Sequence, residues 1–186
     1  MTEAAKEKPK LATCSLAGCF GCHMSILDID ERILDLVDLV EFDKSPINDK
    51  KAFTDRCLVG LIEGGCSTEE NVHVLESFRN NCDILVAVGA CAITGGIPAL
   101  RNNIPLTECL QEAYLNGPTV YNPKGVIPRD PEIPLCLDKV YPCHEVVKID
   151  YFLPGCPPSA DTIWEGLEAL LNGKPLELPY QLVKYD

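Results

Sequence analysis

The sequence predicts a doubly wound parallel α/β sheet, and three observations carry this prediction. Short apolar runs, typical of strands buried on both faces, alternate with longer segments of helical periodicity. The 186 residues have the length of one ordinary domain. Their composition, with 46% hydrophobic and 24% charged residues, is that of a globular chain with a sizeable core. We therefore expect one domain over residues 11–186, after a short polar tail over residues 1–10.

The first half of the chain supplies two strands and two helices to this prediction. A brief apolar run over residues 10–15 predicts the first strand, and apolar residues at helical spacing over 26–40 predict the first helix. The continuous apolar run CLVGLI, residues 57–62, predicts a strand buried on both faces. The following Ser67-Thr-Glu-Glu resembles a capping box and predicts a helix to about residue 80.

The second half continues the alternation. Residues 83–89, DILVAVG, are the clearest buried strand, and a short helix is predicted over 107–117. A further strand over 146–153 is followed by a last helix over 159–172. Gly173 is a good stop signal for that helix, because glycine adopts the left-handed conformation that often ends helices.

One segment, residues 117–148, does not fit a strand–helix unit. It contains six of the 15 prolines and is predicted to be an irregular insertion. A disordered linker is the simplest alternative, but the embedded Val126, Ile127 and Ile133 favour an ordered, packed loop. Because long loops in compact domains are usually functional, we expect this one to contact a partner subunit.

Charge and hydropathy exclude two classes of partner. The net charge of −12 would repel a phosphate backbone, which argues against nucleic-acid binding. No run approaches the roughly 20 apolar residues that a membrane-spanning helix needs. The first ten residues, MTEAAKEKPK, have no apolar export signal and no twin-arginine pair. The sequence therefore predicts a cytoplasmic protein that binds neither nucleic acid nor membrane.

The 11 cysteines are the unusual feature of the composition. Four of them follow predicted strands and lie beside glycines: Cys19 and Cys22 after the first strand, Cys91 after 83–89, and Cys156 after 146–153. Because ligands of open parallel sheets bind at the carboxyl ends of the strands, we expect these four thiols on one edge. Disulfides are disfavoured in the cytoplasm, so the thiols are expected to be metal ligands, redox groups or core residues.

Four converging thiolates suit an iron–sulfur cluster or a structural zinc ion. Structural zinc usually comes from two local pairs, whereas here one CxxC joins two distant single cysteines, which favours the iron–sulfur cluster. A redox dithiol at Cys19 and Cys22, and plain core packing, stay open on spacing alone.

Four motifs that contain these cysteines together resemble the small subunit of [NiFe]-hydrogenases of the soluble, NAD-reducing type. The resemblance covers residues 11–172 and rests on Leu16-Ala-Gly-Cys-Phe-Gly-Cys-His-Met-Ser25, Glu63-Gly-Gly-Cys-Ser67, Gly89-Ala-Cys91 with Gly95-Gly96, and Pro154-Gly-Cys-Pro-Pro158. It implies a flavodoxin-like fold with one proximal [4Fe–4S] cluster on Cys19, Cys22, Cys91 and Cys156.

The resemblance also implies a role as one subunit of a hydrogen:NAD⁺ oxidoreductase. The Ni–Fe catalytic site would lie on a separate large subunit, so this chain would carry no catalytic residue. The cluster would relay electrons between that site and iron–sulfur and flavin-containing diaphorase subunits. FMN in this chain is disfavoured, because the cysteine loop occupies the place where a flavin phosphate would bind.

Departures from related families sharpen the expectation. Membrane-bound and periplasmic relatives have a twin-arginine leader and a C-terminal extension with two more clusters; this chain ends 30 residues after Cys156, so one cluster is expected. Those relatives carry Glu where this chain has Met24, so a proton-path role of that Glu cannot be transferred. The similar complex I subunit has an adjacent Cys-Cys pair in place of Cys19-Phe-Gly-Cys22, which favours the hydrogenase branch. A complex I-like subunit and a zinc-stabilised structural domain remain the alternatives.

Several further residues are expected near the site or in the core. Candidates for contacts beside the cluster or with a partner are His23, Glu63, Cys66, His144 and Glu145. Core packing is expected of Cys14, Cys57, Cys82 and Cys109, whereas a second metal site at Cys136 and Cys143 is disfavoured, because this pair with His144 is one ligand short.

Overall fold

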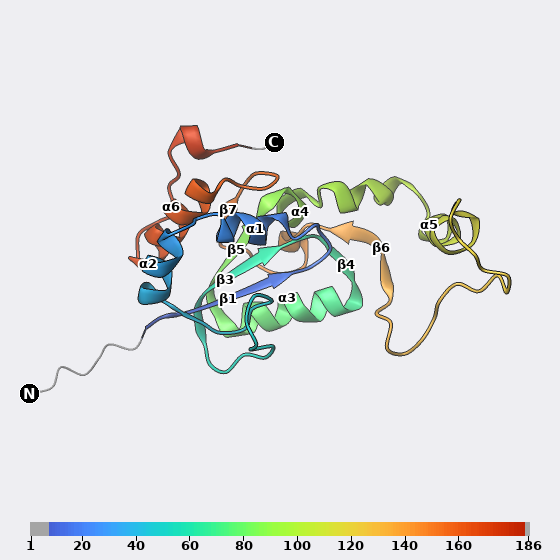
Figure 1. Cartoon of the computed structure of the whole chain (residues 1–186), viewed down its shortest axis with the longest axis horizontal. Coiled ribbons are helices and arrows are strands. Elements are labelled where there is room, and N and C mark those ends of the chain that lie inside the picture. The colour runs from blue at the N-terminus through green and yellow to red at the C-terminus, as the bar shows by residue number, and fades with distance from the viewer. Residues whose placement is uncertain (1–7, 185–186) are drawn as a thin grey trace, which may run out of the picture.

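A computed structural model describes residues 8–184, so most of the predicted tail lies outside the described residues. Its centre is a five-stranded, fully parallel sheet in the order β2-β1-β3-β5-β7 (Figure 1). Numbered within this sheet alone, the strand order is 2-1-3-4-5, that of flavodoxin-like folds. The predicted fold class is therefore confirmed. The strands are β1 (Lys10–Ser15), β2 (Glu41–Phe42), β3 (Cys57–Glu63), β5 (Cys82–Val88) and β7 (Tyr151–Leu153).

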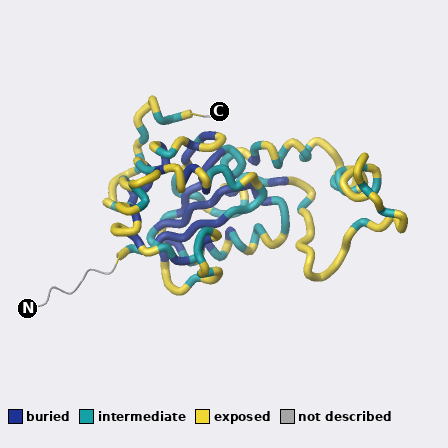
Figure 2. Tube along the Cα trace, viewed as in Figure 1, coloured by how far each residue is buried: buried dark blue, intermediate teal, exposed yellow. Residues whose placement is uncertain are grey.

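Helices cover both faces of the sheet and bury its alternating side chains. On one face, α1 (Gly21–Leu27), α2 (Arg32–Leu39) and α6 (Ala160–Leu171) pack on a core that includes Leu11 and Val86. On the other, α3 (Glu69–Asn81) packs through Leu75 and Phe78 on the neighbouring strand residues. Figure 2 shows the strands as the buried centre of the molecule.

Two predicted helix starts can be compared with their caps. Ser159, at the predicted start of the last helix, caps α6, and its side chain accepts the Thr162 N–H. The cap of α3 is Thr68 rather than Ser67: the Thr68 hydroxyl accepts the Asn71 N–H at 3.2 Å. The difference of one residue arises because the short strand β4 (Cys66–Thr68) continues to Thr68 and α3 begins directly after it, at Glu69.

Three predicted elements differ from the structure. The helix predicted over 26–40 is divided into α1 and α2, because Asp30 adopts a positive φ of 56° between them. The strand predicted over 146–153 is reduced to β7, its last three residues. The 3₁₀ turn Cys143–Glu145 lies just before the predicted strand. The helix predicted over 107–117 consists of α5 (Leu106–Gln111) and a π-helical turn, Glu112–Asn116.

The segment 117–148 is less irregular than predicted. It contains β6 (Cys136–Tyr141), which pairs antiparallel with β4 in a second, two-stranded sheet. The 3₁₀ helix Ile97–Asn103 holds β6 in place, since Asn102 exchanges two hydrogen bonds with Val140 at 2.8 and 2.9 Å.

Residues 104–135, called the arm below, extend away from the sheet (Figures 1 and 2) and are largely exposed. Several large apolar side chains of the arm face solvent, with Tyr121 at 91% exposure. Among the described residues, no helix has both the length and the apolar character needed to cross a membrane.

Candidate metal centre

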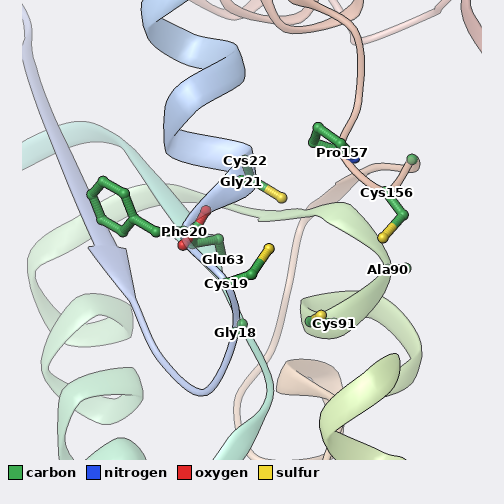
Figure 3. A pocket seen from close by; sticks show the side chains of 12 residues that line it. Gly18, Cys19, Phe20, Gly21, Cys22, Glu63, Ala90, Cys91, Cys156 and Pro157 are labelled. Atoms are coloured by element: carbon green, nitrogen blue, oxygen red, sulfur yellow. The ribbon is translucent and has the colours of Figure 1, made fainter.

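A pocket lies at the carboxyl ends of β1, β3 and β5 and beside the loop that follows β7. All four cysteines that the sequence singles out line it (Figure 3). It encloses about 360 Å³ of empty space, part of which is open to solvent. The lining residues are Gly18, Cys19, Phe20, Gly21, Cys22, Glu63, Gly64, Ala90, Cys91, Gly155, Cys156 and Pro157.

Each cysteine is placed by a tight turn or a short helix that leaves its strand. Cys22 lies in the first turn of α1, and Cys91 lies in α4 (Gly89–Thr94). The Ala90 N–H donates to the Gly155 carbonyl at 2.8 Å, which joins the loops of Cys91 and Cys156. Cys19 and Cys156 are exposed, whereas Cys22 and Cys91 are half-buried.

Glycine allows the backbone to approach these sulfurs closely. At Gly89, where φ is +82°, a Cβ would lie 2.3 Å from the Cys22 Sγ. At Gly96 a Cβ would lie 2.9 Å from the Cys91 Sγ. No side chain fits at either position without moving a thiol, so the site requires glycine there.

The four thiols lie within one another's electrostatic reach. Burial raises the pKa of Cys22 to about 12, and the negative charges of Glu63 and of the other three site cysteines add to this effect. Burial likewise raises the pKa of Cys91, with contributions from Cys156, Cys19 and Glu63. At neutral pH Cys22 and Cys91 are therefore protonated unless a bound metal stabilises their thiolates, as metal ions do outright.

The four thiols are spread around the walls of the pocket and do not converge on a single point. A tetrahedral zinc ion, with Zn–S bonds of about 2.3 Å, needs sulfurs only about 4 Å apart. Within residues 8–184, no three Cys, His, Asp or Glu side chains are arranged to hold one metal ion.

A buried polar network stands behind the pocket. The Glu63 carboxylate accepts the Ser15 hydroxyl at 2.6 Å and the His23 backbone N–H at 2.9 Å. The His23 Nε2 lies 2.9 Å from the Thr13 Oγ1, which lies 2.7 Å from the Ser45 Oγ. Burial alone would raise the pKa of Glu63, but the nearby His23 ring, the Ser15 hydroxyl and the His23 backbone N–H outweigh it and hold this pKa below its ordinary value.

The other predicted site residues are divided between the network, the core and the surface. Glu63 lines the pocket, and His23 is buried beside it, with 3% and 1% exposure. Cys66 does not line the pocket; it is fully buried in the core, as Cys143 is. His144 and Glu145 are exposed, and the His144 ring contacts Phe152 edge to face.

The remaining cysteines lie away from the pocket. Cys14, Cys57 and Cys82 are core residues as expected, and Cys109 is half-buried on α5. Cys136 is exposed, whereas the Cys143 thiol is buried and donates to the Gly64 carbonyl at 3.4 Å.

Phe20, which lies between the first two cysteines, is a pocket residue that the sequence did not predict. It adopts a positive φ of 67°, and its ring stacks on that of His23 with centroids 4.5 Å apart. The only signal in the sequence was its position inside the CxxC. The positive φ could not be predicted, because a bulky residue rarely adopts this backbone conformation.

Comparison with known proteins places the chain in a family. The profile of the family described as NADH ubiquinone oxidoreductase, 20 Kd subunit, matches residues 19–170. The NAD-reducing hydrogenase HoxS subunit delta of Cupriavidus necator is 53% identical over 180 residues, covering 96% of this chain and 86% of that protein. One subunit of the F420-non-reducing hydrogenase of Methanothermobacter thermautotrophicus is 40% identical over 175 residues, covering 93% of this chain and 56% of that one.

A solved structure agrees with these relatives. A chain in the crystal structure of NAD⁺-reducing [NiFe]-hydrogenase in the H₂-reduced state superposes with a TM-score of 0.93 and 49% identity. The match covers 97% of this chain and 100% of that chain. The chain therefore belongs to the NADH ubiquinone oxidoreductase 20 Kd subunit family, and it is homologous to hydrogenase subunits.

Proposed function

We propose that this chain is the electron-transfer small subunit of a cytoplasmic NAD-reducing [NiFe]-hydrogenase, with one [4Fe–4S] cluster held by Cys19, Cys22, Cys91 and Cys156. The observation that carries the proposal is the meeting of these four cysteines, which come from three distant parts of the sequence, around one pocket. Identity of 53% to a NAD-reducing hydrogenase subunit over nearly the whole chain supports the choice of enzyme.

The donor set and the space fit an iron–sulfur cluster. Four thiolates are the usual ligands of such clusters. The space that can take up the centres of water-sized spheres is about 60 Å³, several times the roughly 10–15 Å³ that one water molecule needs on this measure, so it suits a group of several atoms. The glycines beside Cys22 and Cys91 leave room for the backbone to approach the sulfurs, where N–H groups would tune the cluster.

When bound, such a cluster takes up and passes on single electrons, which would connect a Ni–Fe site on a large subunit with the flavin and iron–sulfur subunits that reduce NAD⁺. The chain's own contribution is to hold the four sulfurs and to exclude water on the Cys22 side, where α1 and the buried Glu63 close the pocket. Cys19 and Cys156 are exposed in the chain alone, so a partner is expected to cover that side.

Two alternatives predict different metal contents or partners. A complex I-like subunit would carry the same kind of cluster but join a quinone-linked assembly; the family profile is shared with this class, whereas the relatives named above are hydrogenase subunits. A zinc-stabilised domain would hold a single ion in the pocket.

The 11 free cysteines are typical of a protein in a reducing compartment, which supports a location in the cytoplasm.

Metal analysis tests the cluster. We expect anaerobically purified protein, separated from its partners, to contain about four iron and four sulfide per chain, the content of one [4Fe–4S] centre. One zinc without sulfide would contradict the proposal and favour the structural domain. If the chain is empty as isolated, reconstitution with iron and sulfide decides, because a chain that binds neither under these conditions cannot be the relay. Nickel in the co-purified partner distinguishes the hydrogenase from the complex I-like assembly.

The arm provides a second test, because we expect it to contact the large subunit. It begins 13 residues after Cys91, beyond α4 and the 3₁₀ helix Ile97–Asn103, and Tyr121 on it is 91% exposed in the chain alone. Tyr180 is a matched reference, since it is 88% exposed and lies in the 3₁₀ turn Tyr180–Leu182, outside the arm. Hydroxyl-radical labelling of the intact complex should oxidise Tyr121 much less than Tyr180. Equal labelling of both tyrosines would contradict this role of the arm.

A further inference from the structure

Glu63 occupies a special place between the pocket and the loop that carries two of its cysteines. It is the last residue of β3, it lines the pocket, and it is only 3% exposed (Figure 3). A carboxylate this buried is rare unless its oxygens are hydrogen-bonded. Both oxygens have donors here, namely the Ser15 hydroxyl at 2.6 Å and the His23 backbone N–H at 2.9 Å.

The bond to His23 fixes the backbone directly after Cys22. Helix α1 begins at Gly21, and its cap residue Phe20 makes no side-chain hydrogen bond to the first turn. The first N–H groups of a helix have no partner within the helix. Glu63 supplies an acceptor for one of them from the neighbouring strand, and thereby ties the Cys19–Cys22 loop to the end of β3.

The His23 side chain holds the same loop from the opposite direction. Its ring stacks on Phe20, with the two ring planes only 7° apart. The Nε2 atom is 2.9 Å from the Thr13 hydroxyl on β1, and the Nδ1 atom is 3.1 Å from the Glu63 Oε2 without hydrogen-bond geometry. The ring is thus fixed between two strands, and the loop cannot move independently of Glu63.

We propose that Glu63 is a positioning residue of the metal centre with two separable effects. The reach of its carboxylate holds the Cys19–Cys22 loop in place, and its negative charge at the pocket wall lowers the reduction potential of the bound cluster. The inference rests on the proposed function, because it needs a redox group in the pocket. The charge acts in the stated direction because a nearby anion favours the more positive, oxidised form of the cluster.

Two substitutions at Glu63 separate the effect of side-chain length from the effect of charge. Glu63→Gln keeps the length and an oxygen acceptor but removes the charge, so the midpoint potential should shift upward while iron release to a chelator stays near the wild-type rate. Glu63→Asp keeps the charge but shortens the side chain, so iron release should be about tenfold faster, the effect of losing one hydrogen bond to a charged group, while the potential shifts less than in Glu63→Gln.

The measurements use the complete enzyme complex, with an electron paramagnetic resonance redox titration for the potential. The signal of this cluster is identified as the one that a Cys156→Ala complex lacks. Asp43→Asn is a matched control, because Asp43 is also fully buried and hydrogen-bonded, to Thr54, but does not line the pocket. We expect Asp43→Asn to leave both readouts unchanged.

The outcomes distinguish this inference from the proposed function. If the wild-type chain binds no iron and sulfide even after reconstitution, the proposed function fails. If it contains the cluster but Glu63→Gln leaves the potential unchanged and Glu63→Asp leaves iron release unchanged, only the positioning role is overturned. If the Glu63→Gln complex does not assemble, Glu63→Asp still decides, because unchanged iron release there would overturn the positioning role.

Discussion

Replacing Cys156 by alanine is expected to abolish electron transfer between H₂ and NAD⁺ in the assembled enzyme. Cys156 is the wall of the pocket contributed by the loop after β7, and the hydrogen bond from Ala90 to Gly155 fixes this loop against α4. Loss of a partner that only orients a metal ligand costs roughly 10- to 100-fold in metal affinity or activity. Loss of the ligand itself should exceed this range. We expect H₂-dependent NAD⁺ reduction to fall more than about 100-fold, with iron below four per chain.

The control for this prediction is Cys136→Ala. Cys136 is another exposed cysteine, but it lies on β6, outside the pocket. Its replacement should leave both iron content and activity at the wild-type level, which separates ligand loss from general sensitivity to removing a thiol. Full activity with four iron atoms in Cys156→Ala would show that Cys156 is not a ligand and would remove the relay assignment.

The meeting of the four cysteines could be predicted because it follows from topology. Cys19, Cys22, Cys91 and Cys156 each follow a strand, and parallel strands of one open sheet end at the same edge. The four cysteines therefore meet however far apart they lie in the sequence. The strands themselves were recognisable, since CLVGLI and DILVAVG are continuous apolar runs with no helical period, as expected of strands covered by helices on both faces.

The pairing of β4 with β6 could not be predicted in the same way. Cys66 and Tyr141 are register partners although 75 residues separate them in the sequence. Prolines flank β6, and its sequence CLDKVY, mostly exposed, lacks the continuous apolar run that marks the buried strands. The break between α1 and α2 was missed for a related reason: the apolar spacing continues across Asp30, and only its positive φ ends the helix.

The network around Glu63 was only partly visible from the sequence. The position of Glu63 at the end of a buried strand indicated a place near the pocket, and the structure puts it there. The sequence left His23 open between a contact beside the cluster and a contact with a partner, because a histidine directly after a CxxC fits either. Its burial depends on Thr13 and Ser45, which come from separate parts of the chain and form the hydrogen-bonded chain with it only after folding.

Replacing Gly89 by alanine should empty the metal centre although no ligand is changed. The new Cβ would lie 2.3 Å from the Cys22 Sγ, far inside van der Waals contact, and φ at this residue is +82°, where alanine is strained. Either the Cys22 side chain turns out of the pocket, or the backbone before Cys91 shifts and displaces that ligand. Both routes separate two of the four sulfurs. We therefore expect less than one cluster per chain by iron analysis, and loss of H₂-dependent NAD⁺ reduction comparable with that of Cys156→Ala.

Gly173→Ala isolates the steric part of this effect. Gly173 also has a positive φ, +66°, but a Cβ there would meet no atom within 4 Å. Both substitutions place alanine in the left-handed backbone conformation, which costs about 1–2 kcal/mol. Each should therefore lower the free energy of unfolding by this amount. Only Gly89→Ala forces a carbon atom onto a site sulfur. If Gly89→Ala retained full iron content, or if Gly173→Ala lost it equally, close approach of the backbone to Cys22 would not be what builds the centre.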